Sequence, residues 1–231
     1  METTKKTRRE ALTMFGVTGL AVAVGCGEDS PASPTSTNTG TSSSGCAVAP
    51  TETIGPYPSL SDFVRSDIRE GRTGSRLDLT ITVVNASSNC APVAGALVDV
   101  WQCDAEGHYS QYQQPGHDGT SETFLRGLQT TDAAGRVTFT TVYPGWYAGR
   151  ATHIHVEVRV NGRSAKVTQI GFPENVTAEV YASGVYASKG QNPTSNTGDM
   201  VFADSIASEM ATVSGNPSSG YVATFTLGIA A

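Results

Sequence analysis

Residues 77–84 read LDLTITVV, an alternation of apolar and polar side chains that is typical of a β-strand with one buried face. Residues 96–101 (ALVDVW) alternate in part, and residues 136–141 (RVTFTT) follow a turn-forming DAAG stretch at 132–135. Further strands are expected at three stretches rich in β-branched residues, namely 153–160, 166–171 and 222–227. The pattern therefore predicts about six strands.

Helical signals are short by comparison. One covers residues 176–182, after Pro173, and the other covers residues 203–211. Many short strands, frequent turn residues and few helices predict a mainly all-β fold. We expect a single-domain β-sandwich with few short helices over residues 46–231.

Composition excludes several classes of protein. Only 16% of the 231 residues are charged, which is too few for a coiled coil or a helical bundle rich in Glu and Lys. The net charge of −6 excludes a nucleic-acid binder that relies on a basic surface. Thr18 and Gly19 interrupt the longest apolar stretch before it reaches the ~18 residues of a membrane span, which excludes a polytopic membrane protein.

Residues 1–26 resemble an export signal. Arg8-Arg9 precede an apolar stretch at 11–24, in the position of a twin-arginine motif. The last four residues of the segment, AVGC, resemble a bacterial lipoprotein cleavage box in which Cys26 becomes lipidated. We expect a twin-arginine-type signal peptide, a candidate lipid anchor at Cys26, and a periplasmic, extracellular or membrane-tethered protein. The alternative is that the apolar stretch is an ordinary buried helix.

Residues 27–45 are expected to link this segment to the folded domain. From Ser30 to Gly45 the chain has no charged residue and one apolar residue, Ala32. Such a segment cannot bury enough apolar surface to offset its chain entropy. A flexible linker rich in Ser, Thr and Pro is the prediction.

Three cysteines follow Cys26, so they cannot all pair with one another. Cys90 and Cys103 flank a predicted extended segment at 93–102, which would span roughly 30 Å against the ~6 Å between the Cα atoms of a disulfide. A disulfide would therefore join Cys46 to one of the other two cysteines. The sequence leaves open which one.

Two of the four histidines lie in a His153-Ile154-His155 sequence. Residues i and i+2 of a strand point to the same face, about 7 Å apart along the backbone, so both imidazoles can reach one metal ion. This pattern alone is a weak signal. It gains weight from two segments rich in glycine and aromatic residues, YPGWYAGR at 143–150 and EGHYS at 106–110.

Several of these segments, in order, resemble the intradiol ring-cleavage dioxygenases of the catechol and protocatechuate type. The resemblance runs from Thr51 to about Phe172 and is closest to the small secreted members. It assigns metal ligands, substrate-pocket residues and a catalytic arginine to positions of this chain. The implied ligands are Tyr109, Tyr147, His153 and His155, and the implied substrate-binding residues are Gly55, Pro56, Tyr57 and Gln169.

The resemblance implies a non-heme Fe(III) cofactor and an enzyme of the intradiol dioxygenase class. Catechol-type aromatics would be cleaved by O₂ between the two hydroxyl-bearing carbons to give muconate-type diacids. Tyr147 would be the ligand that leaves when substrate binds, and Arg150 would stabilise negative charge on the ring. Two features depart from the family pattern: only five residues separate Tyr147 from His153, and Ala151 replaces a common proline.

Other interpretations remain at this point. Both tyrosines could be core aromatics, Arg150 could be a surface ion-pair residue, and Trp101 is expected in the core rather than the pocket. His108 and His117 are not expected to be ligands. The whole domain could instead be a non-catalytic binding or carrier module of related fold, or an iron protein unsuited to catechol turnover. Neither the preferred catechol nor the oligomeric state can be read from the sequence.

Overall fold

A computed structural model describes residues 46–231 of the chain. The predicted signal peptide (1–26), the candidate anchor Cys26 and the linker (27–45) lie outside the described residues. The strands and helices follow one another in the order β1 (Arg76–Asn85), η1 (Ala86–Ser88), β2 (Ala91–Pro92), β3 (Leu97–Trp101), β4 (Gln113–Gln114), β5 (His117–Asp118), β6 (Arg126–Thr130), β7 (Arg136–Val142), β8 (His153–Val160), β9 (Arg163–Gly171), α1 (Glu174–Tyr181), η2 (Gly184–Tyr186), η3 (Asn196–Gly198), α2 (Ile206–Glu209), β10 (Thr212–Asn216) and β11 (Gly220–Ile229).

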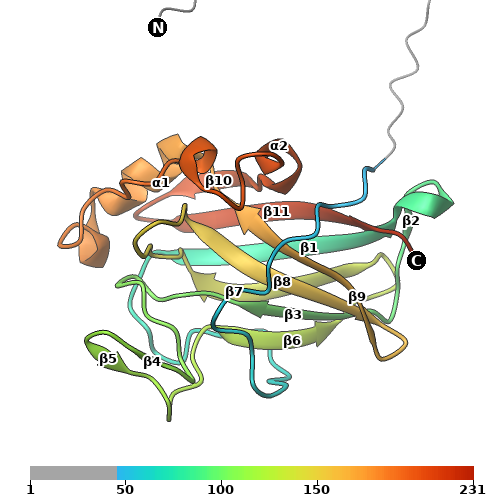
Figure 1. Ribbon diagram of the computed structural model, residues 1–231, viewed down its shortest axis with the longest axis horizontal. Helices are drawn as coiled ribbons and strands as arrows, with labels where there is room; N and C mark the ends of the chain where they lie inside the picture. Colours follow the sequence, from blue (N-terminus) through green and yellow to red (C-terminus); the bar gives the residue numbers. More distant parts are fainter. Residues whose placement is uncertain (1–45) are drawn as a thin grey trace, which may run out of the picture. The chain divides into compact units, whose positions relative to one another are not determined.

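Two sheets face each other (Figure 1). The first has the order β10-β11-β1-β2, with β7 also paired to β1, and its β1–β11 pair is parallel. The second has the order β6-β3-β8-β9 and is antiparallel throughout. The mainly all-β sandwich predicted from the sequence is confirmed.

The core lies between the two sheets. Alternate residues of β1 point into it, beginning with Leu77 and Leu79, while Asp78 and Thr80 are partly exposed. The facing sheet contributes the apolar residues of β3 and of β8, among them Ile154. This inward alternation on β8 leaves His153 and His155 on the outer face of the second sheet.

All six predicted strands are present as β1, β3, β7, β8, β9 and β11. Helix α1 occupies the first predicted helical segment, but α2 is a single turn within the second. The predicted longer helix at 203–211 was wrong because Met210 is extended and bridges Gly171, whose carbonyl oxygen accepts the amide of Ala211 at 2.9 Å. Strands β6 and β10 were not predicted.

The structure pairs Cys46 with Cys90 across a sequence separation of 44 residues. Cys103 is a buried free thiol that packs in an aromatic cluster with Trp101 and Tyr109. The disulfide fixes the start of a segment, residues 46–57, that we call the strap (blue in Figure 1). Within residues 46–231 no helix is long and apolar enough to cross a membrane.

Candidate active site

Strands β3, β8 and β9 place three residues of the site in one row across the second sheet. His155 on β8 is paired with Trp101 on β3 and with Gln169 on β9. All three are buried, because the strap and the loops cover this outer face. His153 lies two residues earlier on the same face and is also buried.

Tyr109 and Tyr147 come from two loops that pack backbone to backbone. The amide of Gly145 donates to the carbonyl oxygen of Asp104 at 3.1 Å, and a Cβ atom at Gly145 would lie 2.3 Å from that oxygen. A Cβ atom at Gly107 would lie 2.3 Å from the carbonyl oxygen of Trp146. Because the two backbones approach so closely, only glycine fits at these positions, which explains the glycine beside each aromatic segment.

The four predicted ligand atoms converge on one point. Nε2 of His153 lies 3.2 Å from the hydroxyl oxygen of Tyr147 and 3.5 Å from that of Tyr109. The same nitrogen lies 3.1 Å from Nε2 of His155. Atoms bound to a single metal ion at about 2 Å lie roughly 3 Å apart at octahedral or tetrahedral angles. The spacing therefore fits a metal centre.

Each histidine ring is held in a defined orientation. Nδ1 of His153 lies 2.6 Å from the carbonyl oxygen of Ala151, and a proton on Nδ1 leaves Nε2 free to bind a metal. The ring of His155 stacks on Trp101, with ring centroids 5.0 Å apart and planes 3° from parallel. A Cβ atom at Gly55 would lie 2.8 Å from Cε1 of His155. Trp101 and Gly55 thus both pack closely against this imidazole.

The pKa values of the two histidines and the two tyrosines in the metal-free protein suit a metal site. Burial, and then the charge of Arg150, lower the pKa of His153 to about 3. Burial, and then the charge of His153, hold the pKa of His155 well below its ordinary value. Burial raises the pKa of Tyr147 to about 12 and holds the pKa of Tyr109 well above its ordinary value. Both imidazoles are therefore neutral in the metal-free protein, whereas both phenols would have to lose a proton to bind a metal.

The strap forms one wall of the site. The carbonyl oxygen of Thr53 accepts a hydrogen bond from Nε2 of Gln169 at 3.1 Å, and Gly55 rests on His155. The ring of Tyr57 lies 4.9 Å from that of Tyr109, centroid to centroid. Pro56 is exposed to solvent.

Arg150 is held by a buried carboxylate that the sequence analysis missed. Nε of Arg150 donates to both carboxylate oxygens of Asp199, at 2.9 and 3.1 Å, and Asp199 is fully buried. Asp199 also accepts the amide of Ala151 at 2.6 Å, in the residue whose carbonyl oxygen orients His153. Nη2 of Arg150 donates to Oε1 of Gln169. Asp199 lies 49 residues from Arg150, so no local pattern could reveal the pair.

One expected and one missed residue pack beside the site. Trp101 is a buried core residue, as expected, and it belongs to a small core cluster with Cys103 and Tyr109. Arg126 on β6 is fully buried and donates to the carbonyl oxygens of Tyr57 and Ser110 and to the Ser110 hydroxyl. It thereby ties the strap to the loop that carries Tyr109. A buried arginine does not fit the apolar alternation that indicates a strand. The sequence therefore revealed neither the role of Arg126 nor strand β6.

His108 and His117 lie together outside the ligand set. Their rings stack with centroids 4.5 Å apart, and His117 pairs with Glu122 at 2.7 Å. Within residues 46–231, no group of three or more His, Cys, Asp or Glu residues is arranged to hold a metal ion. Metal binding at the site described above therefore depends on the tyrosines.

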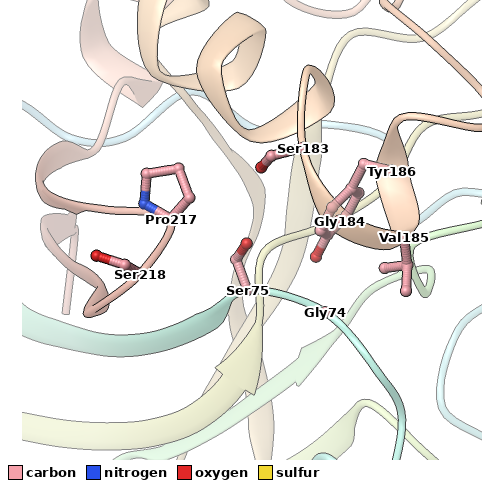
Figure 2. A pocket seen from close by; sticks show the side chains of 8 residues that line it. All are labelled: Gly74, Ser75, Ser183, Gly184, Val185, Tyr186, Pro217 and Ser218. Atoms are coloured by element: carbon pink, nitrogen blue, oxygen red, sulfur yellow. The ribbon is translucent and has the colours of Figure 1, made fainter.

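A cavity of 410 Å³ lies elsewhere, between the start of β1, the turn after α1 and the β10–β11 hairpin (Figure 2). Glycine, serine and apolar residues line it, and the hydroxyl of its Tyr186 is already bonded to the carbonyl oxygen of Tyr143 at 2.6 Å. None of the predicted site residues lines this cavity. We therefore place the candidate active site at the four convergent ligands.

Comparison with known proteins identifies the family of this chain. A family described as dioxygenase matches residues 57–189, more than half of the chain. The intradiol ring-cleavage dioxygenase from Tetranychus urticae superposes with a TM-score of 0.73 at 31% identity, covering 80% of this chain and 95% of that structure. The dioxygenase domain of a carbohydrate-binding fusion protein from Streptomyces sp. SirexAA-E superposes with a TM-score of 0.59 at 28% identity, covering 79% and 97%.

The beta chain of protocatechuate 3,4-dioxygenase from Burkholderia cepacia is 33% identical over 133 residues. The match covers 53% of this chain and 54% of that protein, so the chain spans about half the length of this curated relative. The chain belongs to the intradiol ring-cleavage dioxygenase family.

Proposed function

We propose that this chain is a non-heme Fe(III) intradiol dioxygenase. It would cleave catechol-type aromatics with O₂ between the two hydroxyl-bearing carbons and release muconate-type diacids. The observation that carries the proposal is the convergence of two phenol oxygens and two imidazole nitrogens, with three of the separations between them at 3.1–3.5 Å. It occurs in a chain whose family membership rests on independent grounds.

The residues that would hold iron are Tyr109, Tyr147, His153 and His155. Phenolate oxygen is a hard anionic donor and imidazole a borderline one, a set that suits ferric iron. When bound, Fe(III) would supply Lewis-acid chemistry to the catechol.

The two tyrosines differ in a way that assigns them different roles. Tyr109 is completely buried, whereas Tyr147 is partly exposed at the edge of the site. The pKa of Tyr147, raised to about 12 by burial, marks its phenolate as a strong base when the proton is absent. We infer that Tyr147, as the more exposed of the two tyrosines that would hold iron, would take up a catechol proton at its hydroxyl oxygen. Tyr109 would serve as the fixed one of the two.

Three further groups would act on the substrate. Arg150 lies close enough to the site to lower the pKa of both histidines, so its charge can stabilise negative charge on the ring. Gly55 and Tyr57 form the wall over His155 and Tyr109 and keep water from that side. Gln169 is fully enclosed and orients Arg150 and the strap.

We also propose export for this protein. Support comes from the sequence of residues 1–26, with Arg8-Arg9 before an apolar stretch and Cys26 at its end. A disulfide between Cys46 and Cys90 suits an oxidising compartment.

The test is an anaerobic titration of the iron-loaded protein with catechol. Tyrosinate bound to Fe(III) absorbs visible light, and catechol binding should move that band to longer wavelength. Admitting air should then bleach the band and yield a muconate-type product. A protein that binds no iron, or one whose Tyr109→Phe/Tyr147→Phe variant keeps the same band, would contradict the proposal and favour the non-catalytic binding module.

A further inference from the structure

A segment near the end of the chain lies against the arginine of the site. This segment, residues 192–202, follows the part of the chain that matches the dioxygenase family, and we call it the clasp. Nδ2 of Asn192 donates to the carbonyl oxygen of Arg150 at 2.9 Å. Phe202 is fully buried, and its ring centroid lies 5.9 Å from the guanidinium carbon of Arg150 and 6.3 Å from the ring centroid of His153. Both ends of the clasp therefore contact the site.

Between these ends the clasp carries one buried carboxylate, that of Asp199. Its Oδ2 accepts the amide of Ala151 at 2.6 Å, and its Oδ1 accepts the amide of Val201 at 2.8 Å. Nε of Arg150 donates to both oxygens, at 2.9 and 3.1 Å. All of these partners are N–H donors, so either orientation of an asparagine side chain would place its NH₂ group against a backbone N–H. The surroundings of Asp199 therefore require a carboxylate.

This carboxylate holds two residues of the site at once. Ala151 is bonded through its amide to Asp199 and through its carbonyl oxygen to Nδ1 of His153, at 2.6 Å in each case. Arg150 is bonded at Nε to Asp199 and at Nη2 to Oε1 of Gln169. The orientation of a predicted ligand and that of the guanidinium group thus depend on the same anchor.

The bond to Asp199 leaves the charge of Arg150 effective at the site. Burial has the largest effect on the pKa of His153, but the charge of Arg150 lowers that pKa by more than the charge of Asp199 raises it. Burial likewise raises the pKa of Tyr147, and both the charge of Arg150 and a hydrogen bond from it oppose that rise. Arg150 therefore keeps a positive potential at the predicted ligands while Asp199 fixes its position.

We propose that Asp199 is a positioning residue that holds Arg150 and His153 in the geometry that the reaction requires, so that the clasp completes the site. The inference rests on the proposed function and adds to it a residue from outside the matched region. A guanidinium group that is held in place stabilises charge that develops in the transition state, so its displacement lowers kcat more than it weakens substrate binding. A loosened His153 lowers the affinity for iron.

The first test is Asp199→Asn in the iron-loaded full chain. Per bound iron, kcat for catechol should fall about tenfold or more, whereas the dissociation constant of catechol, measured from the visible band under nitrogen, should change by less than about threefold. The substitution removes the carboxylate that partly offsets the charge of Arg150. If only that charge mattered, and not its position, kcat would stay the same or rise.

The matched control is Asp132→Asn. Asp132 accepts the amides of Ala134 and Arg136, both at 2.8 Å, and lies 4.0 Å from Nε of Arg136, in the turn before β7. It thus combines two backbone amides and one arginine, as Asp199 does, but outside the site. Any effect of this variant should be confined to stability, with kcat per bound iron and iron affinity unchanged.

The second test is the double variant Asp199→Leu/Arg150→Met. It removes one charge of each sign, so the net charge near the ligands is unchanged, and it leaves no buried charge unpaired, so it keeps the inference testable if Asp199→Asn does not fold. Ala151 loses its anchor in this variant. Iron affinity, measured by competition with a chelator, should fall about tenfold or more relative to the unmodified protein.

The outcomes separate this inference from the proposed function. An Asp199→Asn variant that keeps its kcat per bound iron, or a double variant that keeps the iron affinity of the unmodified protein, would overturn the inference, while catechol turnover by the unmodified protein upholds the proposed function. An unmodified protein that binds iron but cleaves no catechol would overturn the proposed function, and the inference with it.

Discussion

Gly55→Ala should weaken iron binding by disturbing His155, a ligand that Gly55 contacts but does not precede or follow in sequence. An alanine Cβ atom would lie 2.8 Å from Cε1 and 3.4 Å from Nε2 of His155, where ordinary carbon contacts lie at about 3.5–4.0 Å. About 0.7 Å of movement is therefore needed. Trp101 stacks on the same ring and is itself buried, which restricts the movement of the imidazole.

The strap cannot easily move away either. It is bonded on both sides of Gly55, through the carbonyl oxygens of Thr53 and Tyr57. A shift of this size exceeds the roughly 0.5 Å tolerance of a metal site, so we expect iron affinity to fall by about 10- to 100-fold. Affinity can be measured by competition with a chelator, with the visible band as the signal.

Backbone strain must be separated from this effect. Gly55 has φ +78°, a left-handed conformation in which alanine costs about 1–2 kcal/mol in its own right. Gly95 has φ +77°, and a Cβ atom added there would meet no other atom within 4 Å, so Gly95→Ala provides the matched control. Both variants should lose the stability that the left-handed backbone costs alanine, Gly55→Ala should lose more because of its contact with His155, and only Gly55→Ala should lose iron affinity. Equal iron affinities in the two variants would refute the reasoning.

Three other predictions concern stability and protonation. Burial raises the pKa of Asp99 to about 7, so ionisation of this carboxyl group increasingly destabilises the folded protein as pH rises from about 4 to 7. The Asp99→Asn variant should therefore become more stable than the unmodified protein across this range, by at most about 4 kcal/mol in urea unfolding. A stability difference that does not change with pH would contradict this prediction. Replacing Cys46 and Cys90 with serine should cost about 4 kcal/mol of unfolding free energy, given the 44-residue separation, and a loss below about 1 kcal/mol would oppose the assigned disulfide. Because Tyr109 and Tyr147 have raised pKa values, iron binding at pH 7 should release about two protons from these ligands. The affinity for chelator-buffered iron should therefore rise with pH. The Tyr147→Phe variant should release about one proton fewer.

The sequence predicted the strands whose two faces differ. Strand β1 alternates because one face packs in the core and the other is partly exposed, and this contrast appears directly in its residues. Strand β8 is buried on both faces at its start. Its histidines could be interpreted as metal ligands only together with the neighbouring aromatic segments. Strand β10 contains Gly215 and little buried surface, so nothing in its composition marked it.

A contrast between local pattern and tertiary fold also explains which residues of the site could be predicted. The two histidines could be proposed together because a strand fixes the relation between residues i and i+2, and the two tyrosines followed from the resemblance to the family. Asp199 could not be proposed, since the tertiary fold brings it to Arg150 from 49 residues away. The partner of Cys46 was equally beyond local reasoning: Cys103 turns into the aromatic cluster, which left Cys90 for the disulfide.

The parallel pairing of β1 with β11 governs when this protein can finish folding. Leu77 pairs with Tyr221, which lies 144 positions later in the chain. During synthesis β1 must wait, with one edge unpaired, until the ribosome has delivered β11. Pairings of such high contact order form slowly, and an unpaired hydrophobic strand is a template for aggregation. Cells that make this protein therefore have to protect a folding intermediate until β11 has docked beside β1.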